Sequence, residues 1–537
     1  MQFTSVYINR YLLPDWSLND VCCYLPAWYG AIASCLVGLI AYESTIPSNS
    51  SSNIFQWVID LFNGKPTEME GLSRPMVLGL TSPAVECGVF AMAMMAIVPA
   101  HLMRSVGGGY DNESVAVTAM TLTFYFWVRS LRDDNSAVKF GFLAGLAYFY
   151  MVATWGGYIF VINLVGVHAA LLVVLGRFSE KVWKSYSLFY LVGTSLAVQV
   201  PVVGWAPIKS LEQLGPCAVF GGYQLLQLCE YLKRRRQLNR TDTWKLRVQV
   251  FGGALAIFVV LVLAVAPSGY FGPISSRVRG LFVQHTKTGN PLVDSVAEHQ
   301  PASSHAYFQY LHHVCSLAPL GFLMVMANLS DASSFLLAWG MTAYFFSHRM
   351  VRLILLTGPI GSALGGIAAG RLFAWCVRQW WEADAVNSAS GEKQAPKAEV
   401  ATKKKKRNSN RKQSTPPPSA NTSFDGFSSL KSALDGALSS KEGIIAKRTF
   451  SCLVLLLGYI LGVNFKHYCW RLSQDLSNPS IIVKARLRDG RVIKLDDYRE
   501  AYWWLRDNTP EDARIMAWWD YGYQITAISN RTTIADG

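Results

Sequence analysis

Long runs of apolar residues, separated by polar segments, dominate the chain. Clear examples are 21–41, 248–267 and 449–463. A helix of about 20 apolar residues crosses the roughly 30 Å hydrocarbon core of a bilayer. In lipid, only helices and closed barrels satisfy the backbone hydrogen bonds. The pattern therefore predicts an α-helical polytopic membrane protein with about twelve spans.

The end of the chain follows a different pattern. Apolar and polar residues alternate over 481–487 and 492–495, on either side of Asp489-Gly490, which predicts a β-hairpin. Thr509, Pro510 and Glu511 have the composition of a helix start. We therefore expect a helix from Pro510 onward, and the start of a mixed α/β domain over 467–537.

These patterns divide the chain into four regions. Residues 1–381 are predicted to form a multi-span membrane domain, with loops 101–114 and 268–305 on the far side of the membrane. Residues 382–446 are rich in Lys, Ser, Pro and Asn and predict a disordered basic linker. Residues 447–466 form the last span, and 467–537 form the N-terminal part of a far-side domain.

Composition and charge agree with a membrane protein. The chain has 51% hydrophobic and 16% charged residues, against about 25% charged in soluble domains. Its net charge of +14 is concentrated in loops such as 233–236 (KRRR) and 403–407 (KKKKR). Because cytosolic loops are enriched in Lys and Arg, we interpret these as cytosolic and expect membrane lipid, not nucleic acid, around the protein.

Three acidic residues fall in the predicted far-side loops: Asp111, Glu113 and Glu298. Carboxylate oxygens suit Mg²⁺ or Mn²⁺, whereas no His/Cys cluster indicates zinc. An isolated D-x-E pattern is, however, more often a solvated loop or a helix start. The acids alone therefore do not decide between a metal site and a structural role.

Four motifs together resemble the catalytic subunit of oligosaccharyltransferase. Trp518–Gly522 (WWDYG) resembles that family's signature, and Arg104–Glu113 (RSVGGGYDNE) resembles its second acidic motif. Ser295–Pro301 (SVAEHQP) is similar to its fifth external loop, and Met350–Arg352 with Pro359 to a further motif. The sequences SVAEHQP at 295–301 and NTPED at 508–512 are similar to those of the eukaryotic branch of this family.

The resemblance implies a function. Such a subunit transfers an oligosaccharide en bloc from a dolichyl-pyrophosphate donor to the asparagine amide of N-x-S/T sequons in the lumen of the endoplasmic reticulum. It implies a multi-pass protein of that membrane with the WWDYG domain lumenal. It also implies as partners the lipid-linked oligosaccharide, the nascent polypeptide acceptor, other oligosaccharyltransferase subunits and the translocon.

The resemblance also implies roles for individual residues. Asp111 and Glu298 would be catalytic and, with Glu113, would bind Mg²⁺ or Mn²⁺. Arg352 and Arg104 would bind the donor pyrophosphate, an interaction to which the guanidinium fork is suited. Tyr158 belongs to a turn similar to one near the donor lipid, although helix packing through its glycines is an equal alternative. The acceptor sequon would be bound by Trp518, Trp519 and Asp520.

Other interpretations stay open at the sequence level. The family's first acidic motif has no match, since neither Asp15 nor Asp20 precedes a long external loop, so we expect that parts of both ends of the protein are missing. A polytopic transporter, or an inactive or scaffolding fragment of the glycosyltransferase, are the alternatives. Acids in the middle of a span would favour transport, and acids at the far-side ends of spans would favour the enzyme.

Overall fold

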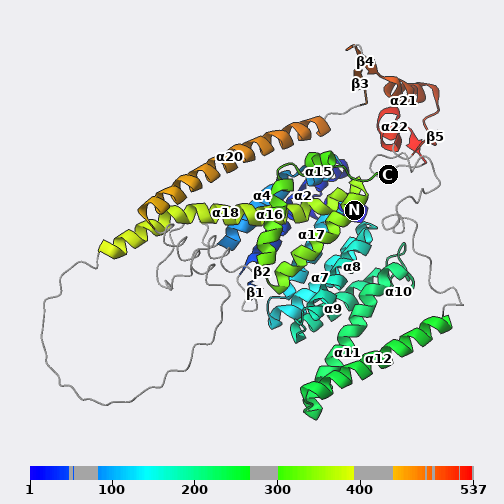
Figure 1. Ribbon diagram of the computed structural model, residues 1–537. Helices are drawn as coiled ribbons and strands as arrows, with labels where there is room; N and C mark the ends of the chain where they lie inside the picture. The colour runs from blue at the N-terminus through cyan, green and yellow to red at the C-terminus, as the bar shows by residue number, and fades with distance from the viewer. Residues whose placement is uncertain are drawn as a thin grey trace, which may run out of the picture. The chain divides into compact units, whose positions relative to one another are not determined.

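The computed structural model describes residues 1–46, 52–53, 83–265, 300–391, 440–477, 481–486, 490–518 and 521–534 (Figure 1). The chain divides into two compact units, Met1–Trp470 and Arg471–Gly537. Each unit is described below by itself.

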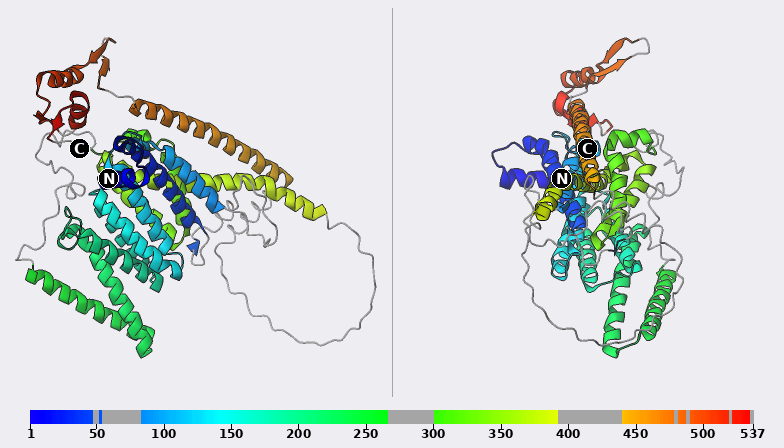
Figure 2. Two further views of the ribbon diagram at one scale, coloured as in Figure 1. Left: turned by 180° about the vertical axis from the view of Figure 1, so that it is seen from behind. Right: turned by 60° about the vertical axis from the view of Figure 1, so that its left-hand side comes forward.

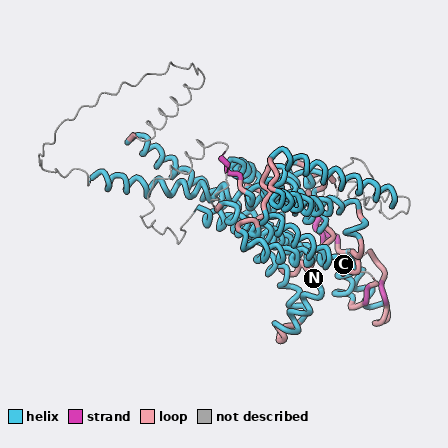
Figure 3. Tube along the Cα trace, turned by 90° about the horizontal axis from the view of Figure 1, so that it is seen from below, coloured by secondary structure: helices cyan, strands magenta, loops and turns pink. Residues whose placement is uncertain are grey.

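The described part of the first unit is almost entirely helical (Figure 3). One short antiparallel pair, β1 (Ser52–Asn53) with β2 (Asn328–Leu329), joins distant segments. The helical elements are α1 (Gln2–Tyr7), the π-helical turn η1 (Ile8–Leu12), α2 (Leu18–Thr45), α4 (Pro83–Ile97), α5 (Pro99–Ser105), α6 (Asn112–Ser130), α7 (Asp134–Thr154), α8 (Tyr158–Val174), α9 (Glu180–Ala197), α10 (Ala206–Lys209), η2 (Leu211–Gln213), α11 (Leu214–Arg236), α12 (Arg240–Val265), α15 (Ser304–Leu311), α16 (Val314–Ala327), α17 (Asp331–Arg349), η5 (Val351–Leu353), α18 (Ile354–Gly391) and α20 (Lys441–Ser477).

Several of these helices are long and apolar enough to cross a membrane. Among the described residues there are four by length and composition, and up to six if each of two bent helix pairs forms one span. The bends are 58° between α4 and α5, and 89° between α15 and α16. A helical, membrane-type architecture is therefore confirmed, while the number of about twelve spans stays a prediction. The four helices comprise the ranges Leu18–Thr45, Asp134–Thr154, Val351–Trp380 and Glu442–Ser477.

Small residues bring α18 close to its neighbours. A Cβ added to Gly366 would lie 2.3 Å from the Cα atom of Ala91 in α4, and one added to Gly370 would lie 2.6 Å from that of Cys87. Membrane helices commonly use such small residues to approach one another, because lipid provides little hydrophobic drive for their association. This contact lies in the main core, in which α18, α4, α2 and α16 pack together.

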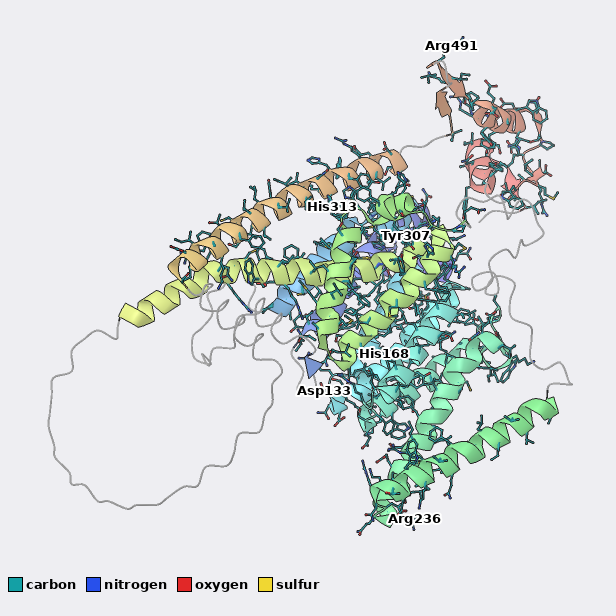
Figure 4. The ribbon with its side chains drawn as sticks, viewed as in Figure 1. Asp133, His168, Arg236, Tyr307, His313 and Arg491 are labelled. Atoms are coloured by element: carbon teal, nitrogen blue, oxygen red, sulfur yellow. The ribbon has the colours of Figure 1, made fainter. Side chains whose placement is uncertain are left out.

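Charged residues join the loops at one end of the bundle. Asp331, at the start of α17, pairs with Arg177 at 3.0 Å and with Lys181 at 3.2 Å. Lys181 also donates to the carbonyl of Leu131, and Arg132 pairs with Glu43. Figure 4 shows Asp133 and His168 toward this end, and Tyr307 and His313 toward the other. The loops 130–139 and 177–184, both of which contain Lys and Arg, thus lie at the same end.

Two long helices have little contact with the remainder of the first unit. Figures 1 and 2 show α12 beside α11, and α20 meeting the far part of α18. Trp380 of α18 donates to Ser451 of α20, and Tyr468 of α20 donates to the carbonyl of Gln309. Between these two contacts, residues 456–464 are exposed, and a Cβ on Gly458 or Gly462 would meet nothing within 4 Å.

The second unit contains the predicted hairpin. Strands β3 (Val483–Arg486) and β4 (Val492–Leu495) pair antiparallel, with Gly490 at a φ of 83° in the connection. Helix α21 (Asp497–Asn508) follows. A short parallel pair, β5 (Arg514–Ile515) with β6 (Thr532–Thr533), is connected by α22 (Gly522–Ser529).

The helix expected from Pro510 onward is wrong. Thr509 instead closes α21, with its hydroxyl donating to the Leu505 carbonyl, and residues after Pro510 form a turn that leads into β5. The buried guanidinium of Arg531 donates to the carbonyls of Arg506 and Thr509. The Thr509 carbonyl, which would accept the first bond of a helix from Pro510, accepts from Arg531 instead, and Arg514 and Ile515 pair with β6, so tertiary contacts override the local helix-start composition.

The predicted linker is only partly described. Helix α18 continues through Glu382 to Gly391, and α20 begins at Lys441, so both flanks of the range 382–446 are helical. The remaining part of that prediction lies outside the described residues.

Candidate functional site

The segment 104–113 links three parts of the first unit. Arg104 is in the last turn of α5, and the following turn contains Gly108, whose φ of 83° suits glycine. The amide of Gly108 donates to the carbonyl of Cys23 in α2 at 2.7 Å. Tyr110 bonds to Ser5 of α1 through their hydroxyl groups, 2.7 Å apart. The segment is thus fixed on α2 and α1 before α6 begins.

Asp111 is the N-cap of α6. Its side chain accepts from the amide of Glu113 at 3.5 Å, and its carbonyl accepts from the hydroxyl of Ser114. A carboxylate is favourable at this position because the amides at a helix start are unpaired and the helix dipole is positive there. Asn112 donates to the carbonyl of Thr154, which fixes the start of α6 to the end of α7.

Glu113 is fully buried between two arginines from different elements. Its Oε1 accepts from Arg352 Nε at 3.0 Å and from Arg352 Nη2 at 2.6 Å. Its Oε2 lies 3.0 Å from Arg104 Nε, in an ion pair without the alignment of a directed hydrogen bond. The side chain of Glu113 is 0% exposed, whereas those of Arg104 and Arg352 are 25% and 37% exposed. The carboxylate therefore lies beneath two partly accessible guanidinium groups.

Arg352 lies in η5, the short turn between α17 and α18. The amide of its neighbour Val351 donates to the carbonyl of Gln300 at 2.9 Å. The amide of Ala302 donates to the carbonyl of His348 at 3.3 Å. The chain at 300–302 is thus bonded to the segment that carries Arg352, and Glu298, two positions earlier, lies outside the described residues.

Tyr158 lies at the start of α8 and is buried. Its hydroxyl accepts from the amide of Gln213 at 3.3 Å, and its ring meets that of Tyr148 edge-on. The glycines of this turn do not mediate helix packing, because a Cβ on Gly156 would meet nothing within 4 Å and the atoms nearest to one on Gly157 would be those of Trp155 in the same turn. The role of Tyr158 in donor binding stays a prediction.

Trp518 lies in the second unit, in the extended segment after β5, with 51% of its surface exposed. Its carbonyl accepts from the amide of Tyr521, whose ring stacks on Tyr498 of α21 with 5.5 Å between centroids. Trp519 and Asp520 lie outside the described residues. An exposed indole has the apolar face and polar N–H that suit contact with a peptide.

The chemistry of the described acids bears on the predicted metal. Among the residues that the structure describes, no three His, Cys, Asp or Glu side chains form a group that could hold a metal ion. Glu113 directs both oxygens at arginines, whereas Asp111 is half-buried. Carboxylate oxygen is the right ligand type for Mg²⁺ or Mn²⁺, so Asp111 fits one ligand position of such a site.

Sequence reasoning missed the arrangement of Glu113 with its two arginines. It identified all three residues, but it assigned the glutamate to the metal and the arginines to the donor. One signal was present in the sequence, because Arg104 and Glu113 carry opposite charges within one predicted far-side loop. The partner Arg352 is 239 positions from Glu113, and no local pattern indicates that contact.

Comparison with known sequences gives one consistent result. Residues 83–359, more than half of the chain, match the family "Oligosaccharyl transferase STT3, N-terminal". The chain is 33% identical over 527 residues to the dolichyl-diphosphooligosaccharide–protein glycosyltransferase subunit stt-3 of Caenorhabditis elegans, covering 95% of this chain and 64% of the relative. It is 34% identical over 456 residues to subunit STT3B of Oryza sativa subsp. japonica, covering 84% and 57%. The chain thus spans less than two thirds of the length of these relatives.

Comparison with solved structures gives the same fold. The crystal structure of the Archaeoglobus fulgidus oligosaccharyltransferase in the apo form superposes with a TM-score of 0.58 at 14% identity, covering 99% of this chain and 56% of that one. The same enzyme tethered to an acceptor peptide containing the NVT sequon superposes with a TM-score of 0.57, at 14% identity and with 99% and 55% coverage.

Proposed function

Because the chain belongs to the oligosaccharyl transferase STT3 family, we propose that it transfers an oligosaccharide en bloc from a dolichyl-pyrophosphate donor to the asparagine amide of N-x-S/T sequons. The observation that carries this proposal is the gathering of Asp111, Glu113, Arg104 and Arg352 at one end of the helical unit. An arginine pair beside acids at helix ends suits a phosphate-bearing lipid.

The two arginines are the proposed donor site. A pyrophosphate is a dense anion, and guanidinium groups bind such oxygens with paired, directed hydrogen bonds. Arg104 and Arg352 are held together by one carboxylate and remain partly exposed. Tyr158 is included as a candidate for the donor lipid on resemblance alone.

Asp111 and Glu298 are the proposed ligands of Mg²⁺ or Mn²⁺. Glu298 is proposed on resemblance, and it lies two positions before Gln300 in the sequence. Gln300 is bonded to Val351, next to Arg352, and Arg352 is bonded to Glu113 in the first turn of α6. This chain of contacts supports a shared site, in which the ion would neutralise charge that develops on the pyrophosphate leaving group.

The acceptor amide must also be activated. Its nitrogen is a poor nucleophile because the lone pair is delocalised into the carbonyl. A carboxylate that accepts the amide N–H groups, for which Asp111 is the described candidate, favours a geometry in which the nitrogen can attack the anomeric carbon. Displacing the dolichyl pyrophosphate then forms the N-glycosidic bond, and the proton from nitrogen passes to a carboxylate or to water.

Trp518, Trp519 and Asp520 are the proposed reader of the acceptor. The carboxylate would accept the hydroxyl hydrogen of the sequon Ser or Thr, between indole walls that exclude water. A peptide without that hydroxyl would leave the acid unpaired, which costs more than the loss of a methyl contact. One of the matched archaeal structures holds an NVT acceptor peptide, which supports a peptide site in proteins of this fold.

We place the protein in the endoplasmic reticulum membrane, with loops 101–114 and 268–305 and the WWDYG unit lumenal. The proposed partners are the nascent polypeptide, further oligosaccharyltransferase subunits and the translocon. Asp111 and Glu113 stand at the start of α6. Acids at a helix end favour the enzyme over the transporter, which would need them in mid-span.

The test of the function uses acceptor peptides. In a full-length protein with its partner subunits, Asp520→Asn keeps the side-chain shape and weakens a charge-assisted hydrogen bond worth roughly 1.5–3 kcal/mol. We expect acceptor affinity to fall by about one to two orders of magnitude, with donor binding nearly unchanged. Asp111→Asn is the matched comparison and should lower turnover while acceptor affinity is kept.

The outcomes separate the roles. If Asp520→Asn lowers turnover but leaves peptide affinity unchanged, the reader role is wrong. If the unmutated complex transfers no glycan from a dolichyl-pyrophosphate donor to a sequon peptide, the proposed function itself is wrong.

A further inference from the structure

Glu113 is the most completely enclosed acid of the described site. It has no exposed surface, and the same carboxylate contacts two guanidinium groups. An isolated carboxylate in such a position would be expensive, because it loses its hydration without compensation. Two arginines this close would, without the acid between them, repel each other. The three side chains therefore depend on one another.

We propose that Glu113 is a positioning residue that holds Arg104 and Arg352 in one fixed orientation for the pyrophosphate of the donor. This inference rests on the proposed function, and it assigns Glu113 to the donor site and not to the metal. Its two oxygens are directed at separate arginines, one on α5 and one on η5. A cation placed on the same oxygens would have to compete with two positive groups.

The geometry favours preorganisation. Arg352 donates through both Nε and Nη2 to one oxygen, which fixes the plane of its guanidinium group. Arg104 meets the other oxygen through Nε. Both guanidinium groups remain partly exposed, at 25% for Arg104 and 37% for Arg352. With the rotamers held, less side-chain entropy is lost when the donor binds.

The backbone around Glu113 is fixed independently of the arginines. Its amide donates to the Asp111 cap, and the adjacent Asn112 is bonded to the end of α7. Arg352 follows Val351, which is bonded to Gln300. The carboxylate thus joins rigid helix ends to the loop segment at 300–302. The length of the side chain matters, because aspartate at 113 is one methylene shorter and would place its carboxylate further from the arginines.

The experiment compares Glu113→Gln, Glu113→Asp and Glu180→Gln in the complete complex. Glu180 is an exposed control, paired with Lys184 one helical turn away on α9. For Glu113→Gln we expect the KM for the lipid-linked donor to rise by about 10-fold or more, with the acceptor KM and the metal concentration for half-maximal activity unchanged. Glu113→Asp should recover part of the loss, and Glu180→Gln should behave as the unmutated complex.

A double-variant cycle tests the coupling directly. If Glu113 acts through the two arginines, then Glu113→Gln should add little to the donor KM of the double variant Arg104→Gln, Arg352→Gln. Additive effects would overturn the proposal, as would a raised metal requirement with an unchanged donor KM. If Glu113→Gln fails to fold, Glu113→Asp decides: an unchanged donor KM in a folded Asp variant contradicts the positioning role. If the unmutated complex transfers no glycan to a sequon peptide, the proposed function itself is contradicted.

Discussion

At the scale of single residues, capping and buried charge define where the helices begin. Asp133 precedes α7, and its Oδ1 accepts from the amide of Ser136 at 2.7 Å. Hydrogen bonds from the Ser136 side chain and backbone hold the pKa of Asp133 below its ordinary value. The ionised form is therefore the one that the folded protein stabilises.

We predict that Asp133→Ala lowers the free energy of unfolding by about 1 kcal/mol at neutral pH, because a helix cap is lost. Since the folded pKa is depressed, this contribution is present above the unfolded pKa of about 4 and is lost as the pH falls through the folded pKa. Thermal unfolding in detergent at several pH values measures the difference. Asp134→Ala, which removes an exposed acid beside the cap, should change stability less; equal losses would contradict the capping role.

The residue scale also shows what sequence could predict. Arg352 and Arg104 are predicted from the cost of an ionised group at the end of an apolar run, whereas Asp111 and Glu113 are predicted from the resemblance of 104–113 to the family motif. The contact between these residues could not be predicted from the sequence, because Glu113 and Arg352 meet only through the packing of α6 against the α17–α18 turn. The roles of Glu298, Trp519 and Asp520 stay predictions, because those residues lie outside the described part of the chain.

At the scale of secondary-structure elements, apolar runs predicted helices well and short motifs less well. The run at 21–41 lies within α2, and the alternation predicted over 481–487 and 492–495 contains the paired strands β3 and β4, with Gly490 at a positive φ in their connection. The helix start predicted at Thr509-Pro510 is wrong, because Arg531 and the β5–β6 pairing form hydrogen bonds with the backbone there. Local composition could not reveal a partner more than 20 residues further along, as the 22-position separation shows.

Helix packing gives a sharper prediction at this scale. Gly366→Leu should destabilise the first unit by about 1–3 kcal/mol or more, because its Cβ would lie 2.3 Å from the Cα atom of Ala91 and α4 must move. Gly458→Leu is the matched control, since a Cβ there meets nothing within 4 Å. Thermal unfolding of the two detergent-solubilised variants should differ clearly. Equal destabilisation would show that helix propensity or lipid contact, not the α4–α18 approach, dominates.

At the scale of the whole molecule, the two ends of the bundle carry different chemistry. One end joins loops through Asp331, Arg177 and Lys181, and the opposite end carries Asp111, Glu113 and their arginines. Sequence predicted this division from the positive-inside rule, because topology depends on charge counts in loops and not on packing. Which end faces the cytosol stays a prediction.

Protease accessibility in sealed microsomes tests the orientation. We expect cleavage near Lys403–Lys406 without detergent, because the basic linker is predicted to be cytosolic, and protection of the segment around Trp518 until detergent is added. A tag beyond residue 466 identifies the protected fragment. Cleavage near Lys403 that appears only after detergent would reverse the orientation of every span.

The contacts at the two ends of α6 limit insertions and deletions in its sequence. Its first turn presents Glu113 to two arginines, and near its other end Trp127 donates to His168 of α8 at 3.0 Å. One inserted or deleted residue between these positions rotates one end of a helix against the other by about 100° and shifts it by about 1.5 Å. Either the arginine cluster or the Trp127–His168 bond would then be lost. The number of residues between Glu113 and Trp127 is therefore fixed by the two contacts at the ends of the helix.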